Sequence, residues 1–279
     1  MEPKTTIPID VVSLLPVLDD NLLNLLRSLS PNDWQKQTVA KLWKVKDVVA
    51  HLLDGNIRVL SMLRDSYSGE SVQAHSYQDL LDYLNTLNAD WVKAMKRVSP
   101  AVLLLLHEAT GKSYCDYYAS LDPFGKAGFA VNWAGENESK NWMHIAREYT
   151  EKWLHQQQIR DAVGLPGLMT KALFYPFIDI FMRALPYTFR DLPAAEQTSV
   201  QVVITTDIGG TWYLCRERGA WLLGKERKSK PLSVVSIDPD MAWKLFSKSI
   251  RPEQISGSIA ITGNRELGEK VLSMISVMA

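Results

Sequence analysis

Glu151 and His155 lie four residues apart in a stretch whose apolar residues recur at helical spacing. Four residues make slightly more than one helical turn, so both side chains would face the same side of a helix. A carboxylate and an imidazole placed in this way can bind one divalent metal, and His51 from an earlier helix would complete a set of three ligands. Three protein ligands leave one coordination position open, as in catalytic zinc sites. The residues therefore predict a catalytic metal site formed by His51, Glu151 and His155.

Two further polar residues, His144 and Glu148, share this stripe of the predicted helix. The four residues follow one another at intervals of four, three and four, and this spacing places them on one face about 60° wide. Sites of this kind are commonly built between the helices of a bundle. We interpret His144 and Glu148 as residues that support the ligands, although Glu148 could replace Glu151 as a ligand. The alternative is a solvated face on which Glu and His merely contact each other one turn apart.

A second polar stripe, on the predicted helix that carries His51, contains Asp47, Gly55 and Arg58. Asp47 would either orient a metal ligand or cap the start of the helix. Gly55, one turn after His51, would leave open volume beside it, and Arg58 could bind a carboxylate of a substrate. The alternative is that His51 is a hydrogen-bonded histidine of the core and that Arg58 is an ordinary surface residue.

Helices positioning these residues are expected throughout the first two-thirds of the chain, because apolar residues recur there at intervals of three and four. Breaks at proline, glycine and serine separate them. The predicted helices span residues 9–29, 45–66, 78–98, 101–121 (as one helix or two), 139–163 and 169–189, the last kinked or divided at Pro176 or Pro186. This pattern predicts a mainly α bundle over residues 1–192.

The remaining residues, 193–279, have a different pattern, with short β-rich runs separated by turn residues. Predicted strands cover residues 200–204, 211–215, 220–223, 232–237 and 256–261, and predicted helices cover 240–246 and 266–278. We therefore expect a small α+β domain after the bundle, with the boundary between residues 190 and 195.

The composition excludes several classes of partner. The 279 residues include 31 basic and 31 acidic side chains, so the net charge is zero and gives no general attraction to nucleic acid or to an anionic membrane. The longest apolar run, residues 101–106, is too short to span a bilayer. The N-terminus lacks the pattern of a signal peptide, and Cys115 and Cys215 fall in different predicted domains. We expect a cytoplasmic protein that binds small molecules, with a homodimer left open.

Three segments resemble the DinB-like metal-binding four-helix-bundle superfamily, and its mycothiol-dependent maleylpyruvate isomerase branch most of all. They are residues 29–34 (LSPNDW), 43–52 (WKVKDVVAHL) and 147–166 (REYTEKWLHQQQIRDAVGLP). Residues 210–214 (GTWYL) through 263–267 (GNREL) are similar to the small sterol-carrier-like domain that follows the bundle in that branch. The resemblance maps the family's metal ligands onto His51, Glu151 and His155 and implies a divalent ion, commonly zinc.

The resemblance also implies an external low-molecular-weight thiol as co-substrate, activated by the metal to add to a small electrophilic or carboxylated substrate. It assigns no catalytic residue, because five arginines of the second domain are equally eligible: Arg216, Arg218, Arg227, Arg251 and Arg265. We therefore expect an isomerase or S-transferase. Two alternatives stay open: a hydrolase that uses metal-bound water, and a non-catalytic binding protein for a small ligand or lipid whose metal site is vestigial.

Overall fold

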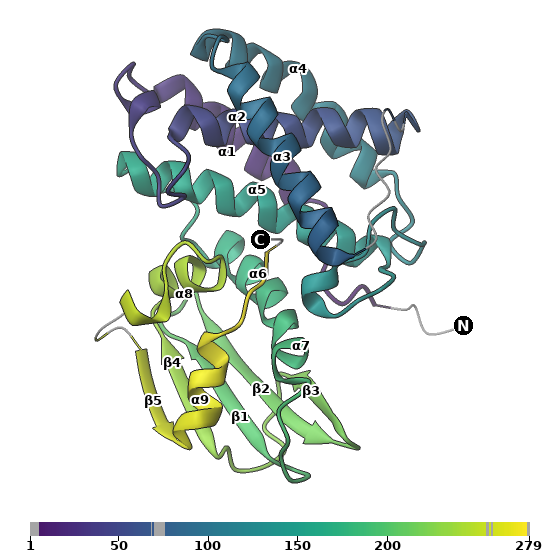
Figure 1. Cartoon of the computed structure of the whole chain (residues 1–279), viewed down its shortest axis with the longest axis vertical. Helices are drawn as coiled ribbons and strands as arrows, with labels where there is room; N and C mark the ends of the chain where they lie inside the picture. The colour runs from purple at the N-terminus through teal and green to yellow at the C-terminus, as the bar shows by residue number, and fades with distance from the viewer. Residues whose placement is uncertain (1–5, 68, 70–75, 255–256, 258, 278–279) are drawn as a thin grey trace. The chain divides into compact units, whose positions relative to one another are not determined.

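The computed structural model of the chain (Figure 1) describes residues 6–67, 69, 76–254, 257 and 259–277. Residues 256, 258 and 278, which the predicted last strand and last helix include, lie outside these ranges. The chain divides into two compact units. The first contains Met1–Gly128 and Lys140–Gly167, and the second contains Phe129–Ser139 and Leu168–Ala279.

The first unit is a helical bundle, so the predicted mainly α architecture is confirmed. Its helices are α1 (Leu14–Ser28), α2 (Val45–Arg58), α3 (Tyr77–Met95), α4 (Pro100–Ala119) and α5 (Asn141–Val163), with a 3-10 turn at Asp33–Gln35 and a π-helical turn at Val59–Arg64 that directly follows α2. Helix α2 packs against α3, α4 and α5, and α1 packs against α4 and α5 (Figure 1). Leucines and valines of α1 and α2, with Leu103 and Ile159, form a buried core between them.

The ends of the helices follow the sequence closely. Ser76 caps α3, because its side chain accepts a hydrogen bond from the backbone N–H of Asp79. Gly164 ends α5 in the left-handed conformation, with φ of 75°, as expected for a glycine at a helix C-terminus. Helix α1 begins at Leu14 and not at residue 9. Pro16 explains this difference, because proline fits the first turn of a helix but disrupts the interior.

The second unit is the predicted α+β module. Its strands are β1 (Ser199–Ile204), β2 (Gly210–Glu217), β3 (Ala220–Gly224), β4 (Ser233–Ile237) and β5 (Ile259–Gly263), and they form one sheet in the order β3-β2-β1-β4-β5. Strands β1 and β4 are parallel, and the other neighbours are antiparallel. Helix α9 (Arg265–Leu272) packs on β1, β4 and β5 (Figure 1), and α8 (Pro239–Phe246) connects β4 to a 3-10 turn at Pro252–Gln254.

Two helices that the sequence assigned to the bundle belong to the second unit. They are α6 (Lys171–Phe181) and α7 (Leu185–Phe189), separated by a 3-10 turn at Met182–Ala184 and thus divided as expected near Pro186. Helix α7 packs against β3, and Trp133, from a 3-10 turn at Asn132–Ala134, contacts Phe181 with ring centroids 6.3 Å apart. The last passage of the chain from the first unit to the second therefore falls after Gly167, whereas the boundary predicted from the sequence lies at residue 192.

Within the residues that the structure describes, no helix combines the length and apolarity needed to cross a membrane.

The buried imidazole of His107 makes stability depend on pH. Burial lowers the pKa of His107 to about 4 against an unfolded value of 6.5, and its Nε2–H donates to the carbonyl of Val49 at 3.0 Å. Between pH 4 and pH 6.5, the unfolded chain binds a proton at His107 that the folded chain does not bind. The free energy of unfolding is therefore highest above pH 6.5 and falls as the pH drops toward 4. As the pH is lowered through this range, the free energy of unfolding of the metal-free wild type should fall by about 1.4 kcal/mol more per pH unit than that of His107→Gln. Urea unfolding measures this difference. Parallel pH profiles for the two proteins would contradict this.

Candidate metal centre

The structure brings the three predicted ligands together. His51 from α2 and Glu151 and His155 from α5 each offer a ligand atom, and these atoms lie within 4.8 Å of one another. Glu151 Oε2 is 3.4 Å from His155 Nε2, and the two imidazole rings meet edge to face with centroids 4.6 Å apart. A tetrahedral metal with bonds of about 2.0–2.1 Å keeps neighbouring ligand atoms about 3.3 Å apart. The donor set and its spacing therefore fit one divalent ion.

Gln158 sets the tautomer of His155. The amide oxygen of Gln158 can only accept, so the Nδ1–H of His155 donates to it, at 2.9 Å. Because Nδ1 is engaged by Gln158, Nε2 is the ring nitrogen that faces Glu151 and can bind a metal. A metal-binding histidine commonly donates its second nitrogen to such a partner, which fixes the orientation of the ring. The sequence alone did not single out Gln158, although its position three residues after His155 places it within reach on the same helix.

His51 is held in the form that binds a metal. Its Nδ1 is buried and has no hydrogen-bond partner among the described residues. Burial lowers the pKa of His51 well below its usual value, and the positive charges of His155, Arg58 and Lys152 lower it further. A neutral imidazole with an unused buried nitrogen is a costly feature for a structural histidine and a useful one for a metal ligand.

Glu151 is ionised despite its surroundings. Burial raises the pKa of this carboxyl, but the hydrogen bond to His155 and the charges of His155 and Arg147 outweigh burial and leave the pKa below its ordinary value. One carboxylate beside two imidazoles is a donor set that suits a divalent cation.

Trp43 covers the two histidines. Its ring centroid lies 4.7 Å from that of His51 and 6.2 Å from that of His155. An indole at this distance shields the imidazoles from water and restricts their rotation. The sequence placed Trp43 in a family segment but gave it no role, because it precedes α2 and its position depends on how the loop folds back.

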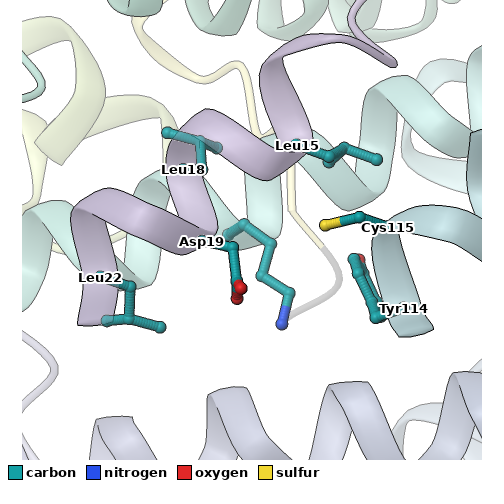
Figure 2. Close-up of a pocket in the computed structure, with 7 residues that line it drawn as sticks. Leu15, Leu18, Asp19, Leu22, Tyr114 and Cys115 are labelled. Atoms are coloured by element: carbon teal, nitrogen blue, oxygen red, sulfur yellow. The ribbon is translucent and has the colours of Figure 1, made fainter. Parts of the chain in front are cut away.

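Lys152 fixes the spacing of the two helices that carry the ligands. Its ammonium donates to the side chain of Asn56 and, at 3.4 Å, to the carbonyl of Leu52, both on α2, and lies 4.3 Å from the centre of the Tyr114 ring. It lines a small pocket with Asp19, Tyr114 and Cys115, which converge from α1 and α4 (Figure 2). Because Lys152 follows Glu151 and Leu52 follows His51, this contact joins α2 and α5 at the level of the ligands.

The remaining candidates have other partners. Asp47 accepts a hydrogen bond from the backbone N–H of Lys44 at 3.0 Å, so it caps α2, the second of its two predicted roles. Glu148 accepts from Tyr114 Oη at 2.8 Å and pairs with Arg147, and His144 contacts Tyr118 Oη at 3.2 Å. Support of the metal ligands by His144 and Glu148 stays a prediction. Arg58 pairs with Asp54 at 3.0 Å.

A nucleophilic thiol of the protein itself is disfavoured. Cys115 and Cys215 are both free and buried, as expected for a chain without a disulfide framework. Burial raises the pKa of Cys115 to about 12 and also raises that of Cys215. Neither forms a thiolate readily at neutral pH, so thiol chemistry at this site needs an external thiol.

Removal of the Gln158 amide should weaken metal binding without abolishing it. In Gln158→Leu, His155 loses the acceptor that orients its ring, and we expect the affinity for zinc to fall about 10- to 100-fold. Competition with a chromogenic chelator measures this directly. Gln157→Leu is the matched control, because it removes a neighbouring buried amide whose Oε1 has no hydrogen-bond partner among the described residues. Equal affinities for the two variants would show that Gln158 does not act on the metal.

The sequence matches the family described as the mycothiol maleylpyruvate isomerase N-terminal domain over residues 15–160. This segment includes all three candidate ligands. A comparison with curated proteins found no match.

Among solved structures, the mycothiol-dependent maleylpyruvate isomerase and a histidine-to-alanine mutant of it each align with 91% of this chain and 92% of their own, at 10% identity and a TM-score of 0.55. At this identity the likeness shows a shared fold, which includes both units. Sterol carrier protein 2-like 2 from Aedes aegypti aligns with 35% of this chain and 95% of its own, at 15% identity and a TM-score of 0.28. That score is too low to support an argument.

Proposed function

Because the chain belongs to the mycothiol maleylpyruvate isomerase family, as its match over residues 15–160 shows, we propose that it is a metal-dependent enzyme that isomerises a small electrophilic acid with the help of a low-molecular-weight thiol. The observation that carries the proposal is the three-ligand cluster of His51, Glu151 and His155, whose ligand atoms lie within 4.8 Å. Three protein ligands leave a position for an exogenous group, and zinc is the ion that best suits two imidazoles and one carboxylate.

A divalent metal in this site would lower the pKa of a coordinated thiol and so provide a nucleophile at neutral pH. The residues of the chain prepare this step. Gln158 engages Nδ1 of His155 and leaves Nε2 for the metal, burial keeps His51 neutral, and Trp43 restricts the access of water to both rings. Because burial raises the pKa of Cys115, which shares a small pocket with Lys152, this thiol does not supply a competing thiolate at neutral pH.

The proposed reaction is a reversible addition. The sulfur forms a bond to one carbon of a cis double bond conjugated with a carbonyl, and the electron pair of the double bond moves to the carbonyl oxygen. The carbon–carbon bond is then single and rotates. The pair returns, the carbon–sulfur bond breaks, and the thiolate leaves the trans product. Thiol, metal and protons are all recovered, so the net reaction is an isomerisation.

The test is the conversion of maleylpyruvate to its trans isomer by the zinc-loaded protein with and without mycothiol. We expect turnover that requires both metal and thiol. Transfer of the thiol to the product would make the protein an S-transferase, and substrate hydrolysis without thiol would support a metal-water hydrolase. Metal binding without any turnover would favour a non-catalytic binding protein.

A further inference from the structure

Two arginines continue the stripes that carry the metal ligands. Arg58 lies seven residues after His51 on α2, and Arg147 lies four residues before Glu151 on α5. Offsets of four and seven residues keep side chains on one face of a helix. The same face of each helix therefore presents a metal ligand and, further along, a guanidinium group.

The register of α2 against α5 puts both arginines at the same end of the site. His51 lies opposite His155, with ring centroids 4.6 Å apart, and Lys152 contacts both Leu52 and Asn56. Residue numbers thus rise along α2 as they fall along α5, so the helices run antiparallel. This register places Arg58 level with Arg147, roughly two helical turns, or about 10 Å, from the two histidines.

The space between the histidines and the arginines is open on the side of α2. Gly55 lies one turn after His51, and a Cβ built on Gly55 would meet no atom within 4 Å. A larger residue at this position would occupy the open space on the face of α2 that carries His51 and Arg58. The open volume that the sequence predicted beside His51 is thus present in the first unit.

Each guanidinium group has a buried Nε–H without a hydrogen-bond partner among the described residues. Arg58 Nε lies 3.0 Å from Asp54 as an ion pair, without the geometry of a hydrogen bond, and the Arg58 side chain is 37% exposed. Arg147 donates from Nη2 to Glu148, and its Nε has no hydrogen-bond partner among the described residues. The charges of these arginines also reach the ligands, since Arg58 lowers the pKa of His51 and Arg147 that of Glu151.

We propose that Arg58 and Arg147 form an anion subsite that binds a carboxylate of the substrate, with Gly55 keeping the path to the metal ligands open. Guanidinium groups recognise carboxylates through paired charge-assisted hydrogen bonds. Arg58 pairs with Asp54 and Arg147 with Glu148, and the charge of Arg147 also acts on Glu151, which a bound divalent cation would neutralise. The subsite rests on the proposed function in that its carboxylate would belong to the molecule that reacts at the metal.

Maleate is the probe, because it carries two carboxylates and needs neither thiol nor turnover to bind. Isothermal titration of the full-length, zinc-loaded protein should show maleate binding that weakens at least tenfold in Arg58→Gln and in Arg147→Gln/Glu148→Gln. The double variant removes both members of the Arg147–Glu148 pair, so no unpaired buried charge remains. Glu148→Gln alone keeps the guanidinium and should retain maleate, as should Arg27→Gln, which removes an exposed guanidinium of α1 paired with Glu108.

Zinc content and circular dichroism are measured for every variant, because they separate loss of the subsite from loss of the metal or of the fold. Gly55→Leu, which fills the open space beside His51 without changing a charge, should also weaken maleate binding. Maleate affinity that is unchanged in both arginine variants would overturn the proposal, and so would a wild-type protein that binds zinc but no maleate. Neither outcome depends on thiol-dependent turnover, so the subsite and the proposed reaction can fail separately.

Discussion

Replacing His155 with alanine is expected to reduce the metal content from about one divalent ion per chain to almost none. His155 Nε2 lies 3.4 Å from Glu151 Oε2, and its ring meets that of His51, so the substitution removes the central member of the ligand set. Loss of a direct ligand should exceed the 10- to 100-fold effect typical of its outer partners. Metal analysis after zinc titration, on protein purified without chelator or affinity nickel, provides the measurement.

The fold should survive this change, because the bundle is held by residues on other faces of α5, including the fully buried Tyr149 and Trp153. His107→Gln is the matched control, since it removes a buried histidine of the bundle that lies outside the cluster and should keep the metal. Glu151→Gln and Glu148→Gln identify the carboxylate ligand, and we expect only the first to release zinc. A wild-type protein that takes up no zinc, manganese or nickel on titration would rule out the site.

The ligand cluster could be predicted from the sequence because it depends mainly on helical periodicity. Glu151 and His155 share a face in any regular helix, and the helix over residues 139–163 is well bounded by Gly164. The contribution of His51 required that α2 pack against α5, which the sequence could suggest but not fix. The role of Asp47 could not be predicted from helical spacing, because a carboxylate in the first turn of α2 can cap the helix or support a ligand. Only the position of the Lys44 N–H distinguishes the two roles.

Features that depend on tertiary register could not be predicted. Lys152 contacts Asn56, which is 96 residues earlier, and nothing in the spacing of either residue indicates that contact. The same holds for Arg147, whose place level with Arg58 follows from the antiparallel course of α2 and α5. Helices α6 and α7 were assigned to the bundle because they are helical and apolar, yet both features also suit helices that cover a sheet. The sequence pattern therefore predicts that a segment is helical better than it predicts which elements the helix packs against.

A small thiol should bind the metal of the cobalt-substituted protein and add a sulfur-to-cobalt charge-transfer band to its spectrum. Thiolate sulfur is a good ligand for zinc and cobalt, and three protein ligands leave it a position. An alcohol of the same carbon skeleton is the matched control and should add no such band. His51→Ala should lose both the band and the thiol-dependent isomerisation of maleylpyruvate, because it removes the ligand from α2 while leaving Glu151 and His155 on α5.

The spectrum and the turnover together separate the candidate functions. A cobalt spectrum that excess thiol leaves unchanged, combined with hydrolysis that needs no thiol, would place water in the open position and contradict the thiol mechanism. A charge-transfer band without turnover would support thiol binding and contradict isomerisation of maleylpyruvate. Other substrates would then have to be tested. Arg58→Gln discriminates further, because the carboxylate subsite lies about 10 Å from the histidines. This variant should keep the thiol band and lose substrate affinity, because the metal would bind the thiol whereas the arginines would bind the carboxylate of the acid.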